Sequence, residues 1–317
     1  MDHVLLPSLP NASNTAFDAQ IEKYLSEEVK KLESAINAGS CSVSMFINLF
    51  LARTVLNIDN SAILKDFEKL LVVNDKCFAY TKEYTEQLHN FDNQYLQNDI
   101  YTEYAHWFLN KCCGEDISEL KARNISGFIH KNGLTYNNEN SDTELKYRMR
   151  GEVLLQTLMS AEILGESSKE LLSDSILSVP KSPYISAEYF RFKLTKGIQQ
   201  DEVSSQEEIC ALIENCKAIH GLADFNASQK FDDFMGTKKR TERDQTVFSP
   251  IATLHGIYLC NAHGLTELSK SLVDDVKLAY EHYGVMLPNF QMRDIVVPFG
   301  PGATVSEVLA LNTILFQ

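Results

Sequence analysis

Two histidines that lie within predicted helices are candidates for acid–base chemistry. His255 lies in the middle of the apolar run 250–262, and His106 lies beside Trp107 in residues 98–112. An imidazole has an unperturbed pKa of about 6.5, so a histidine among apolar residues is a candidate acid or base. A histidine hydrogen-bonded within the core is the commoner alternative. We expect His255 to be a catalytic residue and His106 to bind substrate.

Cationic and aromatic side chains gather near the starts of two further helical patterns, residues 144–163 and 184–196. Arginine forks match the geometry of phosphate and carboxylate, so on a chain with a formal net charge of −14 these cations predict a site for an anionic ligand head. The alternative is salt bridging to neighbouring glutamates such as Glu188. Together with His106, the expected substrate-binding residues are Trp107, Tyr147, Arg148, Arg150, Tyr189, Arg191 and Tyr258.

Metal binding is an open question at this stage. Asp232 and Asp233 lie in the polar segment 224–247 and could hold Mg²⁺ with a diphosphate, which makes them catalytic candidates; a solvated loop is the alternative. Two Cys/His pairs at helical spacing could supply zinc, although no strong spacing signature supports a site. The pairs are Cys216 with His220 and Cys260 with His263. The cofactor therefore stays unknown, with magnesium or zinc conceivable, and no metal ligand is assigned.

The elements that must position these groups are predicted to be helices. The chain has 317 residues, is 44% hydrophobic, and contains only 14 glycines and 8 prolines, which leaves little turn chemistry for many short strands. Apolar residues recur at steps of three and four through residues 17–36, 100–109 and 145–164, whereas strand-like alternation is almost absent. These patterns predict an all-α protein.

A repeat of helix pairs organises the sequence. Asn57, Gly114, Gly165 and Gly264 each end a helical pattern and suit a left-handed helix C-cap, and a second break with an aromatic residue follows about 20 residues later. We expect the last helix to have no partner of its own, as in a ring that closes on the first helix, residues 16–37. The first helix of each successive pair is expected at 44–56, 98–112, 144–163, 184–196, 248–262 and 303–316.

From residue 44 to 317 this pattern resembles the α/α-toroid superfamily of prenyltransferase, squalene-cyclase and terpene-cyclase repeats. Residues 127–136 leading to 141–143, and 285–290 leading to 303–307, look like its turns. The resemblance implies a ring of helical hairpins around a central cavity. The Asp-x-Asp-Asp acid and the Gln-Trp signature are missing, and Trp107 is the only tryptophan. Lanthionine-cyclase toroids are a weaker likeness, because the cysteines and histidines here are not adjacent.

Charge and cysteine content restrict the partners and the compartment. An excess of 43 acidic over 29 basic residues argues against nucleic acid, which requires a basic surface. No stretch approaches about 18 uncharged apolar residues, so no membrane span is expected. The seven scattered cysteines indicate a reducing, cytoplasmic compartment.

The sequence therefore predicts a single all-α domain over 1–317, with an N-terminal helical segment at 1–43 and helical-hairpin repeats at 44–317 closed as an α/α toroid. The expected function is that of a biosynthetic enzyme, a cyclase or transferase that takes an apolar, isoprenoid-type substrate. A non-catalytic helical-repeat scaffold that binds a protein partner is the alternative. A zinc-dependent toroid similar to lanthionine cyclases is a second alternative.

Overall fold

The structure, a computed structural model, describes just over half of the chain. It covers residues 17–39, 43–73, 79–81, 100–115, 117, 119, 121–123, 125–126, 160–165, 181, 184–195, 204–218, 220–223, 248–286 and 301–317. These residues are mostly helical, which confirms the all-α class. The sequence did not predict one feature, an antiparallel pair of short strands, β1 (Leu71–Val73) and β2 (Ala79–Thr81).

The described helices lie where the apolar periodicity placed them. The predictions for 16–37, 44–56, 98–112, 184–196, 248–262 and 303–316 correspond to α1, α2, α5, α9, α12 and α14. Most of the predicted helix 144–163 lies outside the described residues. In chain order the helices are α1 (Ala19–Asn37), α2 (Val43–Val55), α3 (Ser61–Leu70), α5 (Ile100–Cys112), α9 (Ile185–Thr195), α10 (Gln206–Asn215), α12 (Pro250–Ala262), α13 (Thr266–Tyr283), the 3-10 helix η5 (Gly284–Met286) and α14 (Pro301–Leu315).

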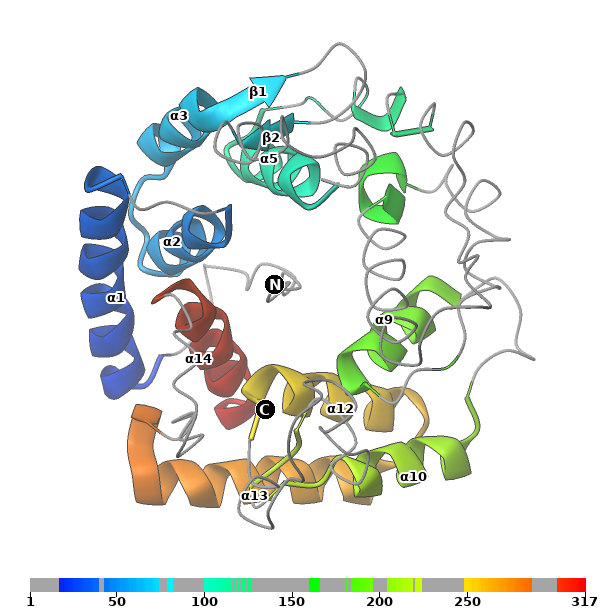
Figure 1. Cartoon of the computed structure of the whole chain (residues 1–317). Helices are drawn as coiled ribbons and strands as arrows, with labels where there is room; N and C mark the ends of the chain where they lie inside the picture. The colour runs from blue at the N-terminus through cyan, green and yellow to red at the C-terminus, as the bar shows by residue number, and fades with distance from the viewer. Residues whose placement is uncertain are drawn as a thin grey trace, which may run out of the picture.

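The helices pack in two layers that follow an arc (Figure 1). We call α5, α2, α14, α12 and α9 the inner layer, because they lie side by side in that order along the inside of the arc. The outer helices cover them: α3 packs on α2 and α5, α1 on α2 and α14, α13 on α12 and α14, and α10 on α12. The last helix of the chain thus lies against the first, as the sequence predicted.

Residue patterning explains which helix enters which layer. Outer helix α1 buries one stripe, from Ile21 to Leu32, and exposes its other side, whereas every described side chain from Met45 to Ala52 of α2 is buried. A helix that is apolar on all sides is stable only when neighbours surround it, which is the position of α2 and α14. Among the described helices, none is both long enough and apolar enough to cross a bilayer.

Helix α14 joins two hydrophobic cores. The N-terminal core contains buried residues of α1, α2, α3 and α5, and the C-terminal core contains those of α9, α10, α12 and α13. The first half of α14 packs in the N-terminal core and the second half in the C-terminal core. Neighbouring residues also bond α14 to both sides: Ser306 donates its hydroxyl to Asn48 on α2 over 2.8 Å, and Glu307 accepts from the Ile251 amide on α12 over 3.0 Å.

The turns that the sequence singled out share one geometry. Asn57, Gly114, Gly165 and Gly264 all have positive φ, which confirms the predicted left-handed caps. In three of these turns the following amide reaches back five residues to a carbonyl: Ile58 to Arg53, Glu115 to Asn110, and Leu265 to Cys260, each over 2.8–2.9 Å. The helices that precede these turns, α2, α5 and α12, all belong to the inner layer.

Candidate functional site

The contact between α9 and α12 brings together the aromatic candidates. The imidazole of His255 stacks on Tyr189, with ring centroids 4.6 Å apart and planes 16° apart, and meets Phe190 edge-on at 5.1 Å. Tyr258 lies 5.6 Å from Tyr189. The hydroxyl of Ser186 lies 3.0 Å from Nδ1 of His255. Ser186, Tyr189 and Phe190 occupy positions i, i+3 and i+4 of α9, so one face of that helix presents all three to α12.

Burial keeps this aromatic cluster neutral. Burial, followed by the nearby charge of Lys193, lowers the pKa of His255 to about 3, so the imidazole is uncharged at pH 7. Burial, followed by the neighbouring Tyr258, raises the pKa of Tyr189 to about 12, and burial also raises the pKa of Tyr258. A general base works best with a pKa near the working pH. In this arrangement His255 is suited to hydrogen bonding with Ser186, and its catalytic role stays a prediction.

Lys193 supplies the positive charge beside the cluster. Its ammonium lies 5.7 Å from the ring centroid of Tyr189 and 5.9 Å from that of Phe190, within the range of cation–π attraction. The side chain is exposed and lies in the last turn of α9, where the helix dipole favours a cation. The α9–α12 contact therefore offers an apolar aromatic surface with an accessible cation at its edge.

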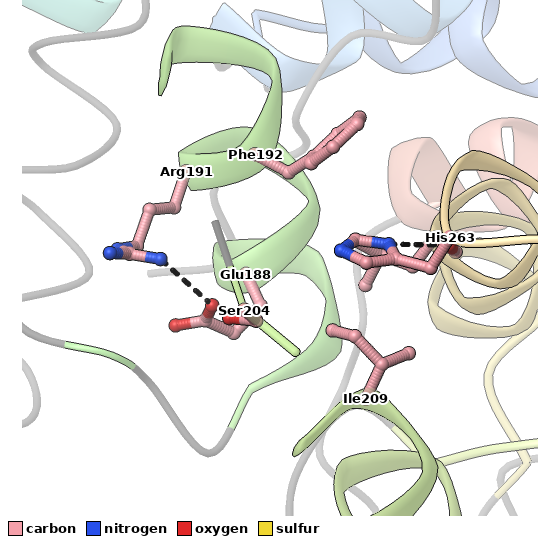
Figure 2. Close-up of a pocket in the computed structure, with 7 residues that line it drawn as sticks. Glu188, Arg191, Phe192, Ser204, Ile209 and His263 are labelled. Carbon is pink, nitrogen blue, oxygen red and sulfur yellow. Dashed lines mark hydrogen bonds and ion pairs between the residues drawn. The ribbon is translucent and has the colours of Figure 1, made fainter. Parts of the chain in front are cut away.

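A narrow cavity with no room for a water molecule lies on another side of α9, against α10 and the end of α12 (Figure 2). Within it the Arg191 guanidinium and the Glu188 carboxylate form a buried ion pair at 3.7 Å. The sequence left two roles open for Arg191, binding an anion or forming a salt bridge to Glu188. The structure contains the salt bridge. The lining residues are Glu188, Arg191, Phe192, Ser204, Ile209, Leu259 and His263.

His263 turns one ring nitrogen into this cavity. Its Nδ1 lies 2.9 Å from the Leu259 carbonyl, which only accepts, so Nδ1 donates this hydrogen bond. Nε2 is buried and has no hydrogen-bond partner within the described part of the chain. The ring also packs against Phe192, with centroids 5.2 Å apart.

The structure places His106 and Trp107 in the N-terminal core, apart from the α9–α12 cluster. His106 lies between inner helix α5 and outer helix α3, where its Nε2 is 3.1 Å from the Glu68 carboxylate; burial is the main cause that lowers its pKa. Trp107 packs on Tyr104 at 5.5 Å and carries the Lys111 ammonium 4.7 Å from its ring centroid. These contacts show packing, and the binding roles of both residues stay predictions.

The metal candidates are only partly described. Within the described residues, no group of three or more His, Cys, Asp or Glu side chains is arranged to hold a metal. Burial, with Cys210 nearby, raises the pKa of Cys260 to about 12, whereas zinc binds the thiolate. The candidates Asp232, Asp233, Tyr147, Arg148 and Arg150 lie outside the described residues.

Ser186 is the member of the cluster that sequence reasoning missed. Its position three residues before Tyr189 on the same helix was visible, but its pairing with His255 depends on how α9 and α12 pack, and no local signal encodes that. The same holds for Ser204 and Ile209 beside Arg191 and Glu188.

Comparison with known proteins assigns no family to this chain. No family model matches it, and neither the curated proteins nor the solved structures give a match. The function is therefore argued from the geometry of the inner layer.

Proposed function

We propose that this protein is an α/α toroid whose inner layer binds an apolar metabolite that carries an anionic group, and that it acts on this ligand as a cyclase or transferase. The α9–α12 contact is the proposed binding surface. Tyr189, Tyr258 and Lys193 are the proposed ligand contacts, with Ser186 and His255 behind them.

The architecture supports the first part of this proposal. Inner helices α2, α5 and α12 end in the same left-handed turn, outer helices cover the inner layer, and the last helix lies between α2 and α12. Helical pairs that repeat in this way either stack openly or close into a ring. The contact of α14 with α1 supports the closed form, because closure would place the last helix beside the first.

One observation carries the second part: the half-buried rings of Tyr189 and Tyr258 lie beside an exposed lysine. Aromatic rings bury apolar ligand surface and stabilise positive charge that develops on a substrate. A lysine ammonium provides a point charge for a phosphate or carboxylate. A ligand with both an apolar body and an anionic head uses both features at once.

The narrow cavity beside Arg191 is not the proposed ligand site. The space between its lining residues leaves no room for a water molecule, whereas small-molecule pockets enclose roughly 300–1,000 Å³. The ion pair of Arg191 with Glu188 also leaves no net charge there for an anion. The ligand is therefore placed against α9 and α12 on the face that carries Tyr189 and Lys193.

Two measurements test the proposal. Mass spectrometry of the purified protein should detect a retained apolar ligand. Calorimetric titration should show farnesyl diphosphate binding more tightly than farnesol, and Lys193→Met should remove most of that difference while Tyr189→Leu weakens both. The matched control is Lys270→Met, which changes an exposed lysine of outer helix α13. No retained ligand and no binding of either probe would overturn the proposal.

The small volume of the described cavity favours a second candidate, a non-catalytic scaffold whose acidic surface binds a protein partner. A scaffold carries no metabolite, and a partner held by a chain of net charge −14 should dissociate as salt screens the charges. The zinc-dependent alternative finds no support in the described residues, where no metal-binding group is formed.

A further inference from the structure

A hydrogen bond joins the residue before α1 to α13. The Tyr280 hydroxyl on α13 donates to Oδ1 of Asp18 over 2.6 Å. The same oxygen accepts the Gln20 amide over 2.8 Å, as the N-cap of α1. This hydrogen bond to Tyr280 is the main cause that lowers the pKa of Asp18, so the carboxylate is charged at neutral pH. One carboxylate thus caps α1 and holds α13.

The backbone on the other side of this contact is shaped to fit α1. Gly284 ends α13 with φ 62° and ψ −151°, a conformation that side chains rarely adopt. A Cβ at this position would lie 2.7 Å from the side-chain oxygen of Gln20. The next residue, Val285 in η5, is buried in the N-terminal core although α13 itself belongs to the C-terminal core. The flexible end of the exposed Gln20 side chain can move away from such a Cβ, so it is the positive φ that favours glycine where η5 turns from one core into the other.

The residues at this junction lie between the two cores. Tyr280 packs against both cores while remaining only partly buried, and Asp18 is partly exposed as well. The other link between the cores, α14, is buried along most of its described length. The two cores are therefore linked strongly through α14 and more weakly at Asp18, where water has access. Local opening breaks weak, water-accessible contacts before buried ones.

We propose that Asp18 and Tyr280 form a clasp that holds the start of α1 to η5, and that the clasp opens locally while α14 keeps the two cores together. Opening breaks the Tyr280–Asp18 bond and separates Gln20 from Gly284, and it leaves the inner-layer contacts of α14 with α2 and α12 in place. The clasp is a conformational device of the fold, and it is independent of the ligand proposed above.

Hydrogen–deuterium exchange on the full chain tests this clasp. Tyr280→Phe keeps the ring and removes only the hydroxyl, so it should raise exchange about three- to tenfold in both α1 residues 19–25 and residues 280–286, the effect of one hydrogen bond. Exchange in α9 and α12 should not change. Asp18→Asn keeps an N-cap acceptor but loses the charge, and it should give a smaller increase at both segments.

Tyr258→Phe is the matched control, because it removes the hydroxyl of another partly buried tyrosine, which lies on α12 and packs against the C-terminal core. It should leave both segments as in the wild type. Unchanged exchange in Tyr280→Phe would overturn the clasp, and so would an increase confined to one of the two segments. An equal increase across α9 and α12 would also overturn it, because global destabilisation would then account for the effect.

Discussion

Burial determines the charge of His255, and it makes the stability of the protein depend on pH. Its pKa of about 3 in the folded protein lies below its pKa of about 6.5 in an unfolded chain. Between these values the unfolded chain binds a proton that the folded chain does not. The free energy of unfolding therefore does not depend on this residue above about pH 6.5. As the pH falls from there toward 3, His255 lowers the free energy of unfolding by at most about 1.4 kcal/mol per pH unit.

The variant His255→Asn tests this dependence, because it has no group that titrates in that range. Urea unfolding from pH 7 to pH 4 should give a flatter curve of unfolding free energy for the variant than for the wild type. Parallel curves for the wild type and His255→Asn would show that the ring is accessible to protons in the folded state.

The ion pair of Glu188 and Arg191 separates a structural role from a ligand-binding one. Arg191→Ala leaves the Glu188 carboxylate, whose side chain is only 6% exposed, without this cation, which should cost about 3 kcal/mol of unfolding free energy. Glu188→Gln combined with Arg191→Met should recover part of that loss, as denaturant unfolding of the single and double variants would measure. If Arg191 anchors an anionic ligand instead, Arg191→Ala should leave stability unchanged and weaken farnesyl diphosphate binding about 10- to 150-fold.

Each left-handed turn ends an inner helix, so its backbone conformation fixes the length of that helix. A Cβ at Gly114 would contact nothing within 4 Å, so Gly114→Ala should cost only the conformational strain of positive φ, about 1–2 kcal/mol. Asn57 has φ 56° in the equivalent turn, and Asn57→Gly should be neutral or slightly stabilising. Thermal unfolding measures both. A loss in Asn57→Gly as large as that in Gly114→Ala would show that the Asn57 side chain matters more than the backbone.

The ranges of the helices could be predicted from local signals in the sequence. The contacts between helices could not. The stripes of α1 and the glycine that ends α5 are written in adjacent residues, so their ranges could be predicted. The pairing of Ser186 with His255, and of Asp18 with Tyr280, joins residues 69 and 262 positions apart and depends on packing. Strand β1 was missed because Leu71–Val73 continues the apolar run of α3, and only its partner β2 distinguishes it from another helical turn.

At the scale of the whole molecule, α14 should make the two cores unfold together. Leu311 is fully buried in the C-terminal half of α14, and Leu311→Ala should cost about 2–5 kcal/mol. Trp107, the only tryptophan of the chain, lies in the N-terminal core and reports on that core alone. Because the same helix packs in both cores, the fluorescence midpoint of Trp107 in urea should fall as far as the circular dichroism midpoint.

Val308→Ala, in the half of α14 that packs in the N-terminal core, is the matched variant for this experiment. Both substitutions should shift a single transition, because loss of either half of α14 also exposes residues that the other core buries. If the cores are independent, Leu311→Ala should lower the circular dichroism midpoint and leave the Trp107 transition where it is. Two separate transitions would then assign α14 to the C-terminal core and leave the clasp at Asp18 as a contact between independently stable halves.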